Sequence, residues 1–288
     1  MPPVTISKAS DRDTARKIHR LADSYVPRFQ KVYPAQVKRL RASLVDSAID
    51  AALDRGITGQ PVELYAAVDE LAIAKEERPE VAVYSELLVE GAKIQGVVLD
   101  LKSPFVLDAA KRLTANLVTQ VSQETKRAIR QVIFEAVLEG KAPAVAKRDI
   151  RRIIGLTRRD ALAVLRYPRP QGAERYAQKL LNRRALTIAR TETQFAANRG
   201  QQLAWKEMAR DNLIDTSRLS QRWLTTASDR TCDLCAPMNG QIVSLGSSFT
   251  SSERGVLPSA RVPYDGGVTE SPPLHPSCRC CLVADYGE

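Results

Sequence analysis

Three shortages in this sequence narrow the classes of protein that it can encode. Aromatic residues make up only 5% of the chain, which argues against a surface that stacks single-stranded bases. No run of about 18 apolar residues occurs, so we expect no membrane-spanning helix and no membrane partner. The first residues lack the apolar core of a secretory signal, so we expect the protein to remain in the compartment where it is made.

Cysteine is also scarce, and it is confined to one end of the chain. All five cysteines follow residue 230. A disulfide-stapled protein would rarely leave 230 residues without a cross-link, and an odd number of cysteines leaves one thiol unpaired. The clustering therefore favours a metal site over disulfides.

The spacing of these cysteines is typical of a zinc site. A C-x-x-C pair is followed by an H-x-x-C pair with the same internal spacing, and 39 residues lie between the two pairs. Zinc prefers four nitrogen or sulfur ligands in a tetrahedron, and this set leaves no position open for water, so we predict a structural Zn²⁺. The predicted ligands are Cys232, Cys235, His275 and one of Cys278 and Cys280.

The same segment contains few large apolar residues. We therefore expect metal binding to supply much of its folding free energy. Cys281 directly follows the C-R-C run at 278–280, which adds a further thiol close to the predicted ligands.

Catalytic motifs are missing from the sequence. It contains no Gly-rich phosphate loop, no nucleophile elbow and no H-E-x-x-H. A nuclease of the ββα-metal type would need a histidine base, but His275 belongs to the predicted metal site. The other histidine, His19, lies in an amphipathic helical pattern where packing is the commoner role. We expect a protein that is not an enzyme.

Positive charge is concentrated in the middle of the chain. The formal net charge is +10, and residues 101–230 alone carry 26 Lys and Arg against 12 Asp and Glu. Such a surface is either a solvated helical face or a binding surface for an anionic partner such as DNA or an acidic protein. The candidate basic surface comprises Lys126, Arg127, Arg130, Arg151, Arg152, Arg158 and Arg159.

Apolar residues at helical spacing predict a mostly helical chain up to about residue 210. Thr157 and Asp160 have the form of a capping box, and small residues line one side of the last helix so that another element can approach closely. A break is expected at Pro34. The predicted helices cover 11–55 with that break, 62–75, 81–98, 122–140, 147–154, 157–165 and 174–208.

Composition changes after residue 215, where Gly, Ser and Pro become frequent. Residues 223–226 look like a strand, and residues 245–271 look like extended loops. We predict an α+β fold that is mostly α, with a long helical body and a small C-terminal irregular or β module stabilised by zinc. The predicted division is an N-terminal helical region at 1–100, a basic helical domain at 101–222 and the zinc module at 223–288.

Several short motifs occur in an order that resembles one known family. They are A-R-T-E-T at 189–193, A-N-R-G at 197–200, Trp223, D-R-T-C-D-L-C at 229–235, N-G-Q at 239–241 and P-P-L-H-P-S-C-R-C at 272–280. In this series they resemble the phage Mu F-like minor head proteins, also called head morphogenesis proteins. The resemblance covers roughly residues 100–288.

The resemblance implies a minor capsid component of a tailed phage virion, assembled in the host cytoplasm. Its implied partners are the portal protein at one capsid vertex, the major capsid protein and packaged double-stranded DNA. Within the motifs we assign structural or partner-contact roles to Arg190, Thr191, Glu192, Asn198 and Trp223. For the first three we favour a hydrogen-bonded joint to the zinc module. The alternative function is a zinc-dependent nucleic-acid-binding protein or nuclease.

Overall fold

The computed structural model describes residues 11–43, 49–50, 53, 79–215, 217–226, 231–251, 255–256, 263–264 and 267–286. The described chain forms two compact units. Unit 1 combines residues 1–29, 81–110 and 187–288, and unit 2 combines residues 30–80 and 111–186. The helix predicted at 62–75 lies outside the described residues, and the three-part division made from composition stays a prediction.

Helices make up most of the described chain, and a small antiparallel sheet lies near its C-terminal end, which confirms the predicted α+β class. Short 3₁₀ turns occur at Pro170–Gly172 and Ala236–Met238. The α-helices are α1 (Asp11–Ser43), α4 (Pro79–Lys93), α5 (Pro104–Leu138), α6 (Pro143–Ile153), α7 (Arg158–Leu165) and α8 (Ala173–Arg210).

Helix α1 is continuous through Pro34, so the break predicted there is wrong. A proline inside a helix removes one backbone hydrogen bond and costs about 3 kcal/mol. The apolar stripe continues in phase on both sides of this proline, where Tyr33, Val37 and Leu40 are all buried. The free energy gained by burying this stripe offsets the cost of the lost hydrogen bond. The helix-breaking tendency of proline alone therefore does not predict whether α1 continues.

Helix α5 begins 18 residues before the predicted start at Ser122. Ser103 caps it, because the Val106 backbone N–H donates to Ser103 Oγ at 3.2 Å, and Pro104 occupies the first helical position, where its missing N–H costs nothing. Ser122 instead lies inside the helix. The start of α5 is therefore set by the Ser103-Pro104 pair.

Unit 2 contains two short helices, of which α6 begins four residues before its predicted start at residue 147 and α7 begins at the predicted cap. Thr157 caps α7, accepting a hydrogen bond from the Asp160 backbone N–H at 3.1 Å. Gly155 precedes this cap with φ of +83°, a left-handed conformation that favours glycine. Tyr33 donates its hydroxyl proton to the Gly155 carbonyl, and burial raises the pKa of Tyr33 to about 12.

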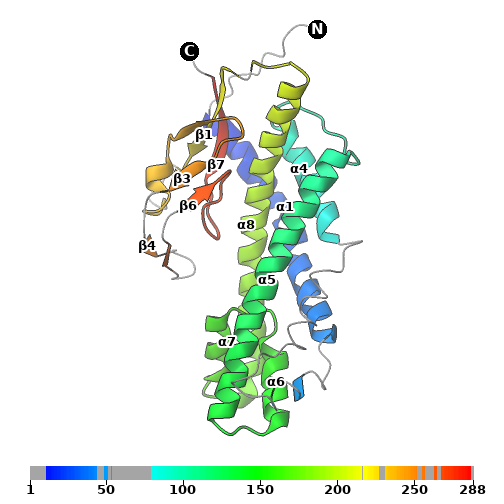
Figure 1. The fold of residues 1–288 in the computed structure, drawn as a ribbon, viewed down its shortest axis with the longest axis vertical. Helices are drawn as coiled ribbons and strands as arrows, with labels where there is room; N and C mark the ends of the chain where they lie inside the picture. Colours follow the sequence, from blue (N-terminus) through cyan, green and yellow to red (C-terminus); the bar gives the residue numbers. More distant parts are fainter. Residues whose placement is uncertain are drawn as a thin grey trace. The chain divides into compact units, whose positions relative to one another are not determined.

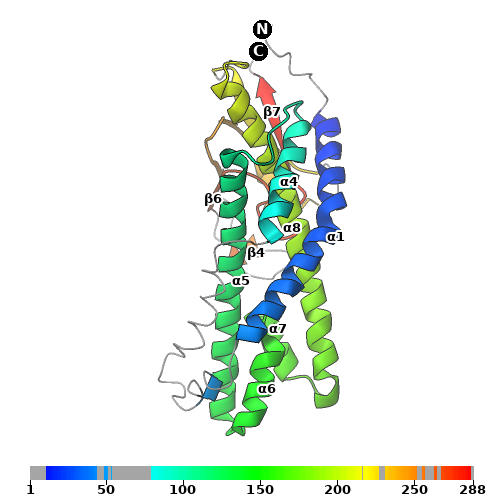
Figure 2. The ribbon, with the colours of Figure 1, turned by 90° about the vertical axis from the view of Figure 1, so that its right-hand side faces the viewer.

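In unit 1, α4 and α8 cross at two glycines (Figure 2). A Cβ added to Gly200 would lie 2.4 Å from the Leu88 carbonyl oxygen and 2.9 Å from the Gly91 Cα. The side of α8 predicted from its small residues is therefore the side that α4 contacts. Such close backbone approach requires residues without bulk at both positions.

The sheet of unit 1 lies beside α8 (Figure 1). Its order is β2-β1-β7, with β1 antiparallel to both neighbours, and Trp223 of β1 is paired with Leu282 of β7. Two further antiparallel pairs, β3-β6 and β4-β5, occupy a stretch that we predicted as loops. The strands are β1 (Leu219–Leu224), β2 (Ile242–Ser244), β3 (Phe249–Ser251), β4 (Gly255–Val256), β5 (Pro263–Tyr264), β6 (Gly267–Thr269) and β7 (Cys281–Tyr286).

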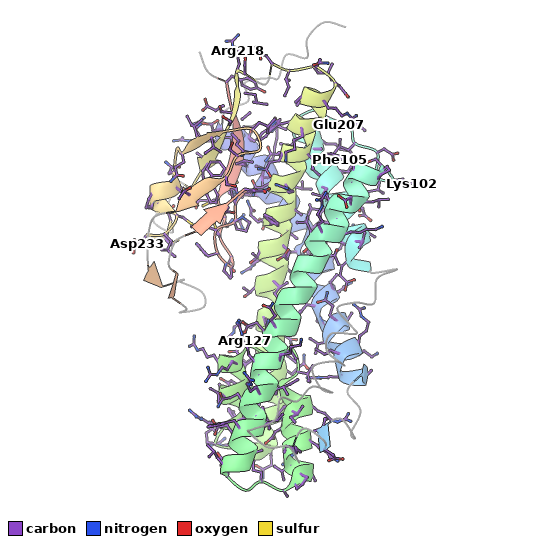
Figure 3. The ribbon with its side chains drawn as sticks, in the orientation of Figure 1. Lys102, Phe105, Arg127, Glu207, Arg218 and Asp233 are labelled. Carbon is purple, nitrogen blue, oxygen red and sulfur yellow. The ribbon has the colours of Figure 1, made fainter. Side chains whose placement is uncertain are left out.

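Apolar side chains are exposed where α4 leads into α5. Val98, Leu101 and Phe105 have exposed fractions of 81%, 41% and 38%. They lie in unit 1, and Val98 and Phe105 line a cavity of about 370 Å³ with Glu207 of α8. Figure 3 labels Phe105 and Glu207. Exposed apolar groups gathered in this way are typical of surfaces that bind another protein.

Candidate metal centre

The first half of the centre is a tight turn after β1. The backbone N–H groups of Cys235 and Ala236 both donate to the Cys232 carbonyl, at 3.0 and 2.9 Å, which bends the chain between the two cysteines. Gly240 then adopts φ of +81° and donates its N–H to the Trp223 carbonyl at 2.8 Å. This reversal fastens the turn to the sheet and holds both sulfurs on one side.

The second half is the turn that precedes β7. Cys278 donates its backbone N–H to the His275 carbonyl at 3.1 Å, and Ser277 between them has φ of +63°. His275 Nδ1 lies 3.0 Å from the Pro276 carbonyl oxygen, which can accept its proton. That tautomer leaves the Nε2 lone pair facing the sulfurs, as a metal-binding imidazole requires.

The two turns bring the predicted ligand atoms together. His275 Nε2 lies 3.1 Å from Cys232 Sγ and 3.3 Å from Cys235 Sγ, and Cys235 Sγ lies 3.6 Å from Cys278 Sγ. Ligand atoms around tetrahedral zinc are about 3.5–3.8 Å apart, given bonds of about 2.0–2.3 Å. Only the Cys235–Cys278 distance lies in this range, and the two distances to His275 are shorter, as expected for donor atoms in direct contact. The Cys/His groups could nevertheless hold a metal ion.

Cys280 also lies within reach. Cys232, Cys235 and His275 form one compact group, Cys235, Cys278 and Cys280 form another, and Cys235 belongs to both. The Cys280 backbone N–H donates to Cys278 Sγ at 3.4 Å, and contact with the Cys235 and Cys280 thiols lowers the pKa of Cys278. Cys278 and Cys280 both remain candidates for the fourth ligand.

The centre is embedded in an apolar core. Trp223 and Phe249 are fully buried and meet edge to face at 5.3 Å between ring centroids. Trp205 and Met208 of α8 pack into the same cluster as Cys235, Cys278 and Cys280. The segment after residue 222 therefore shares a core with α8, which the sparse apolar residues of that segment alone did not reveal.

Four buried amide side chains on α8 hold the backbone of the tail. We name this set the amide stripe. Asn198 Oδ1 accepts from the Leu282 N–H at 2.8 Å, and the Asn198 amide donates to the Cys280 carbonyl at 3.3 Å. The Gln194 amide also donates to the Cys280 carbonyl, at 3.0 Å. The Gln201 amide donates to the Leu282 carbonyl at 3.2 Å. The amide stripe comprises Gln194, Asn198, Gln201 and Gln202.

The amide stripe satisfies polar groups that would otherwise be buried without partners. Gln202 donates to the Glu270 carbonyl at 2.7 Å, which ties the segment before the second turn to the same helix. Only Asn198 was predicted. The signal for the others was present, because amides at 194, 198, 201 and 202 share one face of a helix.

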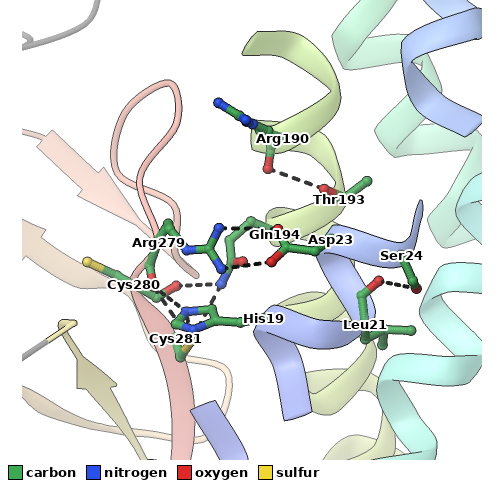
Figure 4. Close-up of polar contacts among 10 residues, drawn as sticks. All are labelled: His19, Leu21, Asp23, Ser24, Arg190, Thr193, Gln194, Arg279, Cys280 and Cys281. Carbon is green, nitrogen blue, oxygen red and sulfur yellow. Dashed lines mark hydrogen bonds and ion pairs between the residues drawn. The ribbon is translucent and has the colours of Figure 1, made fainter. Parts of the chain in front are cut away.

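His19 contacts the tail as well, but not as a ligand of the cluster (Figure 4). Its Nε2 lies 2.9 Å from the Arg279 carbonyl oxygen and 3.2 Å from Cys281 Sγ, and burial lowers the pKa of His19. Arg279 forms a two-pronged ion pair with Asp23, at 3.1 and 3.2 Å. These contacts give His19 the packing role that its helical pattern favoured.

The remaining motif residues of α8 have separate roles. Thr191 Oγ1 accepts from the Ser277 N–H at 2.9 Å, so Thr191 joins α8 to the second turn. Glu192 instead accepts from the Tyr84 hydroxyl of α4 at 2.5 Å, and burial raises the pKa of Glu192 to about 7. Arg190 is exposed. Only Thr191 of these three makes the predicted joint directly.

The predicted basic residues lie on α5, α6 and α7 of unit 2, and several are neutralised locally. Arg127 pairs with Glu124 at 2.9 Å. Arg152 pairs with the carboxylates of Asp149 and Glu174, and Arg158 donates to the side-chain oxygen of Gln131. Arg130 and Arg151 are exposed, as are Arg158 and Arg159, and Lys126 is half-buried.

Together, the fold and the site define a mostly helical protein whose C-terminal sheet is built around a Cys/His cluster suited to a metal ion. A family model described as Phage Mu protein F like protein matches residues 127–283, which is more than half of the chain. The chain belongs to this family, whose members are phage head proteins. No match was found among curated proteins or solved structures.

The matched range ends in β7 and includes both turns of the cluster. Within the part of the chain that the structure describes, no helix is long and apolar enough to cross a bilayer.

Proposed function

We propose that this protein is a minor capsid protein of a tailed phage that binds the portal and assists head assembly and DNA packaging or ejection. The observation that carries the proposal is membership of the Mu F-like family over residues 127–283. The role proposed is that of a non-enzymatic assembly component in the virion, with the portal and the major capsid protein as partners.

The exposed apolar patch supports a protein partner. We name Val98, Leu101 and Phe105 the apolar patch; it is accessible at the α4–α5 connection of unit 1. Burying such side chains against a partner contributes about 25 cal/mol for each Å² of apolar surface removed from water. We assign contact with the portal or major capsid protein to this patch.

The metal that suits the cluster is zinc in a structural role. Sulfur and imidazole donors match the ligand preferences of zinc, and three thiolates with one imidazole would complete a tetrahedral site. Bound zinc would fasten the turn after β1 to the turn before β7. The proposed ligands are Cys232, Cys235, His275 and Cys278.

The proposal is tested by purifying assembling heads and portal complexes that contain the tagged full-length protein. We expect the protein to copurify with portal, and the Phe105→Asp variant to lose this association while keeping its fold. Absence of the wild-type protein from portal and capsid fractions would overturn the function.

A nuclease is the competing function. Divalent-metal-dependent cleavage of duplex DNA by the purified protein would favour it, and loss of that cleavage in His19→Ala would establish His19 as the base. We expect no cleavage.

A further inference from the structure

Helix α6 has two faces of opposite character. Ala146, Ile150 and Ile153 are buried against the core of unit 2. Lys147, Arg148 and Arg151 are spaced by one and three residues, which places them together on another face. Of these three cations, only Arg151 belongs to the basic surface predicted from the sequence.

This basic face lines a cavity of about 450 Å³ in unit 2. The charged residues around the cavity are Arg41 of α1, Glu174 of α8, and Lys147, Arg148, Arg151 and Arg152 of α6. Five cations thus surround one carboxylate. A concave basic surface concentrates positive potential more strongly than a flat one.

Internal ion pairs neutralise only part of this charge. Lys147 pairs with Asp50 at 2.6 Å, and Arg152 pairs with Asp149 at 3.1 Å and with Glu174 at 3.0 Å. Arg148 is exposed and has no carboxylate partner among the described residues. Arg148 therefore keeps positive charge available at the cavity.

Arg41 of α1 adds a further cation to this cavity. Its Nη2 donates to the Arg152 carbonyl at 3.5 Å, and its buried Nε has no hydrogen-bond partner within the described part of the chain. A buried donor without an acceptor is costly. Arg41 lines the cavity, so its guanidinium adds positive charge there.

We propose that the basic face of α6, with Arg41, binds the phosphate backbone of double-stranded DNA. Arg148 and Arg151 are three residues apart on one side of the helix, so both can face the same stretch of phosphate backbone. Contacts to phosphate alone do not distinguish one base from another, so the binding should be independent of the DNA sequence. The proposal rests on the proposed function in so far as packaged DNA is the polyanion that a head protein meets.

The test measures binding of a 30-base-pair duplex to the full-length protein across a salt series, with Arg148→Ala/Arg151→Ala as the variant. We expect the variant to lose at least about tenfold in affinity near 0.1 M salt, and the salt slope to fall by about 2. The matched control is Arg16→Ala/Arg20→Ala, which removes two exposed cations of unit 1 and should bind as the wild type does.

Two further measurements distinguish DNA binding from binding of an acidic protein and from a general effect of net charge. Arg148→Lys/Arg151→Lys should keep most of the affinity, because a lysine ammonium also neutralises phosphate. Polyglutamate at equal charge concentration should compete poorly with DNA. Effective competition by polyglutamate would overturn the proposal in favour of an acidic protein partner, and equal losses in the variant and the control would reduce it to an effect of net charge.

Failure of this inference differs from failure of the proposed function. If the protein copurifies with portal but the variant binds DNA normally, the α6 site is wrong and the function stands. If DNA binding depends on α6 but the protein is absent from heads, the site stands and the function is wrong.

Discussion

At the scale of single residues, Cys235 has the most connected position in the candidate centre. Its sulfur belongs to both groups of ligand atoms and contacts His275 and Cys278. Its removal would therefore separate the two turns, whereas removal of Cys281 would leave every proposed ligand in place.

The Cys235→Ala variant should lose bound zinc and become protease-sensitive after residue 222, while unit 2 keeps its resistance. Elemental analysis of the purified protein and mass spectrometry of proteolytic fragments measure these outcomes. Cys281→Ser is the control and should retain metal. Stoichiometric zinc in the Cys235 variant would contradict the assignment.

Glu192 makes the stability of unit 1 depend on pH. Its pKa is about 7 in the folded protein against an ordinary value of 4.5, so the folded state binds the proton more tightly. The stability from this group is complete below about pH 4.5 and is lost as pH rises through 7. Glu192→Gln should stabilise the protein at pH 8 by about 1–2 kcal/mol, a figure reduced for screening because the residue is half-buried.

Urea unfolding at pH 5.5 and pH 8 measures this effect. Glu139→Gln, on an exposed position, is the control and should leave the pH dependence unchanged. An equal change for the Glu192 variant at both pH values would rule out the titration.

At the scale of elements, two kinds of contact hold unit 1 together. Small residues let the backbones of α4 and α8 approach closely, and amide side chains of α8 hydrogen-bond the backbone of the tail. The small side of α8 was predictable from its spacing, as were the cap at Thr157 and the extent of α8. The continuity of α1 through Pro34 was not, since it depends on tertiary burial of Tyr33 and Val37. The amide stripe was missed because polar residues on a helix usually face water.

The metal cluster was predictable to a different degree. The C-x-x-C and H-x-x-C spacings identified the residues that come together, because local turns bring each pair to one side. The spacing alone did not choose between Cys278 and Cys280, and in the structure both lie in one group with Cys235.

Gly200→Ala should destabilise unit 1 although alanine is the better helix former. The gain in helix propensity is about 1 kcal/mol, whereas the new Cβ would lie 2.4 Å from the Leu88 carbonyl oxygen and force α4 and α8 apart. We expect a net loss of about 2 kcal/mol or more. Thermal unfolding compared with Lys179→Ala, an exposed change on the same helix, tests this, and an unchanged midpoint would contradict it.

Asn198→Ala should loosen β7. The change leaves the Leu282 N–H without its acceptor in a buried setting, at a cost of about 1–3 kcal/mol. Hydrogen exchange at the Leu282 amide should accelerate. Gln178→Ala, which removes an exposed amide of α8, should leave that exchange rate unchanged.

At the scale of the whole molecule, the two units should respond differently to loss of metal. The candidate centre lies entirely in unit 1, and the helices of unit 2 have their own buried core. A chelator should therefore expose the tail to proteolysis while most helical circular dichroism persists. Loss of all helical signal would show that the units unfold together, contrary to this expectation.

The ion pair between Asp23 and Arg279 joins positions 256 residues apart. Unit 1 is assembled from three stretches of chain, and all of unit 2 lies between the first and the last of them. During synthesis, unit 2 has every segment it needs before the sheet has left the ribosome. The early residues of α1 can therefore meet their partners in the tail only after most of the chain has been made, and the Cys/His cluster can form only at that late stage of synthesis.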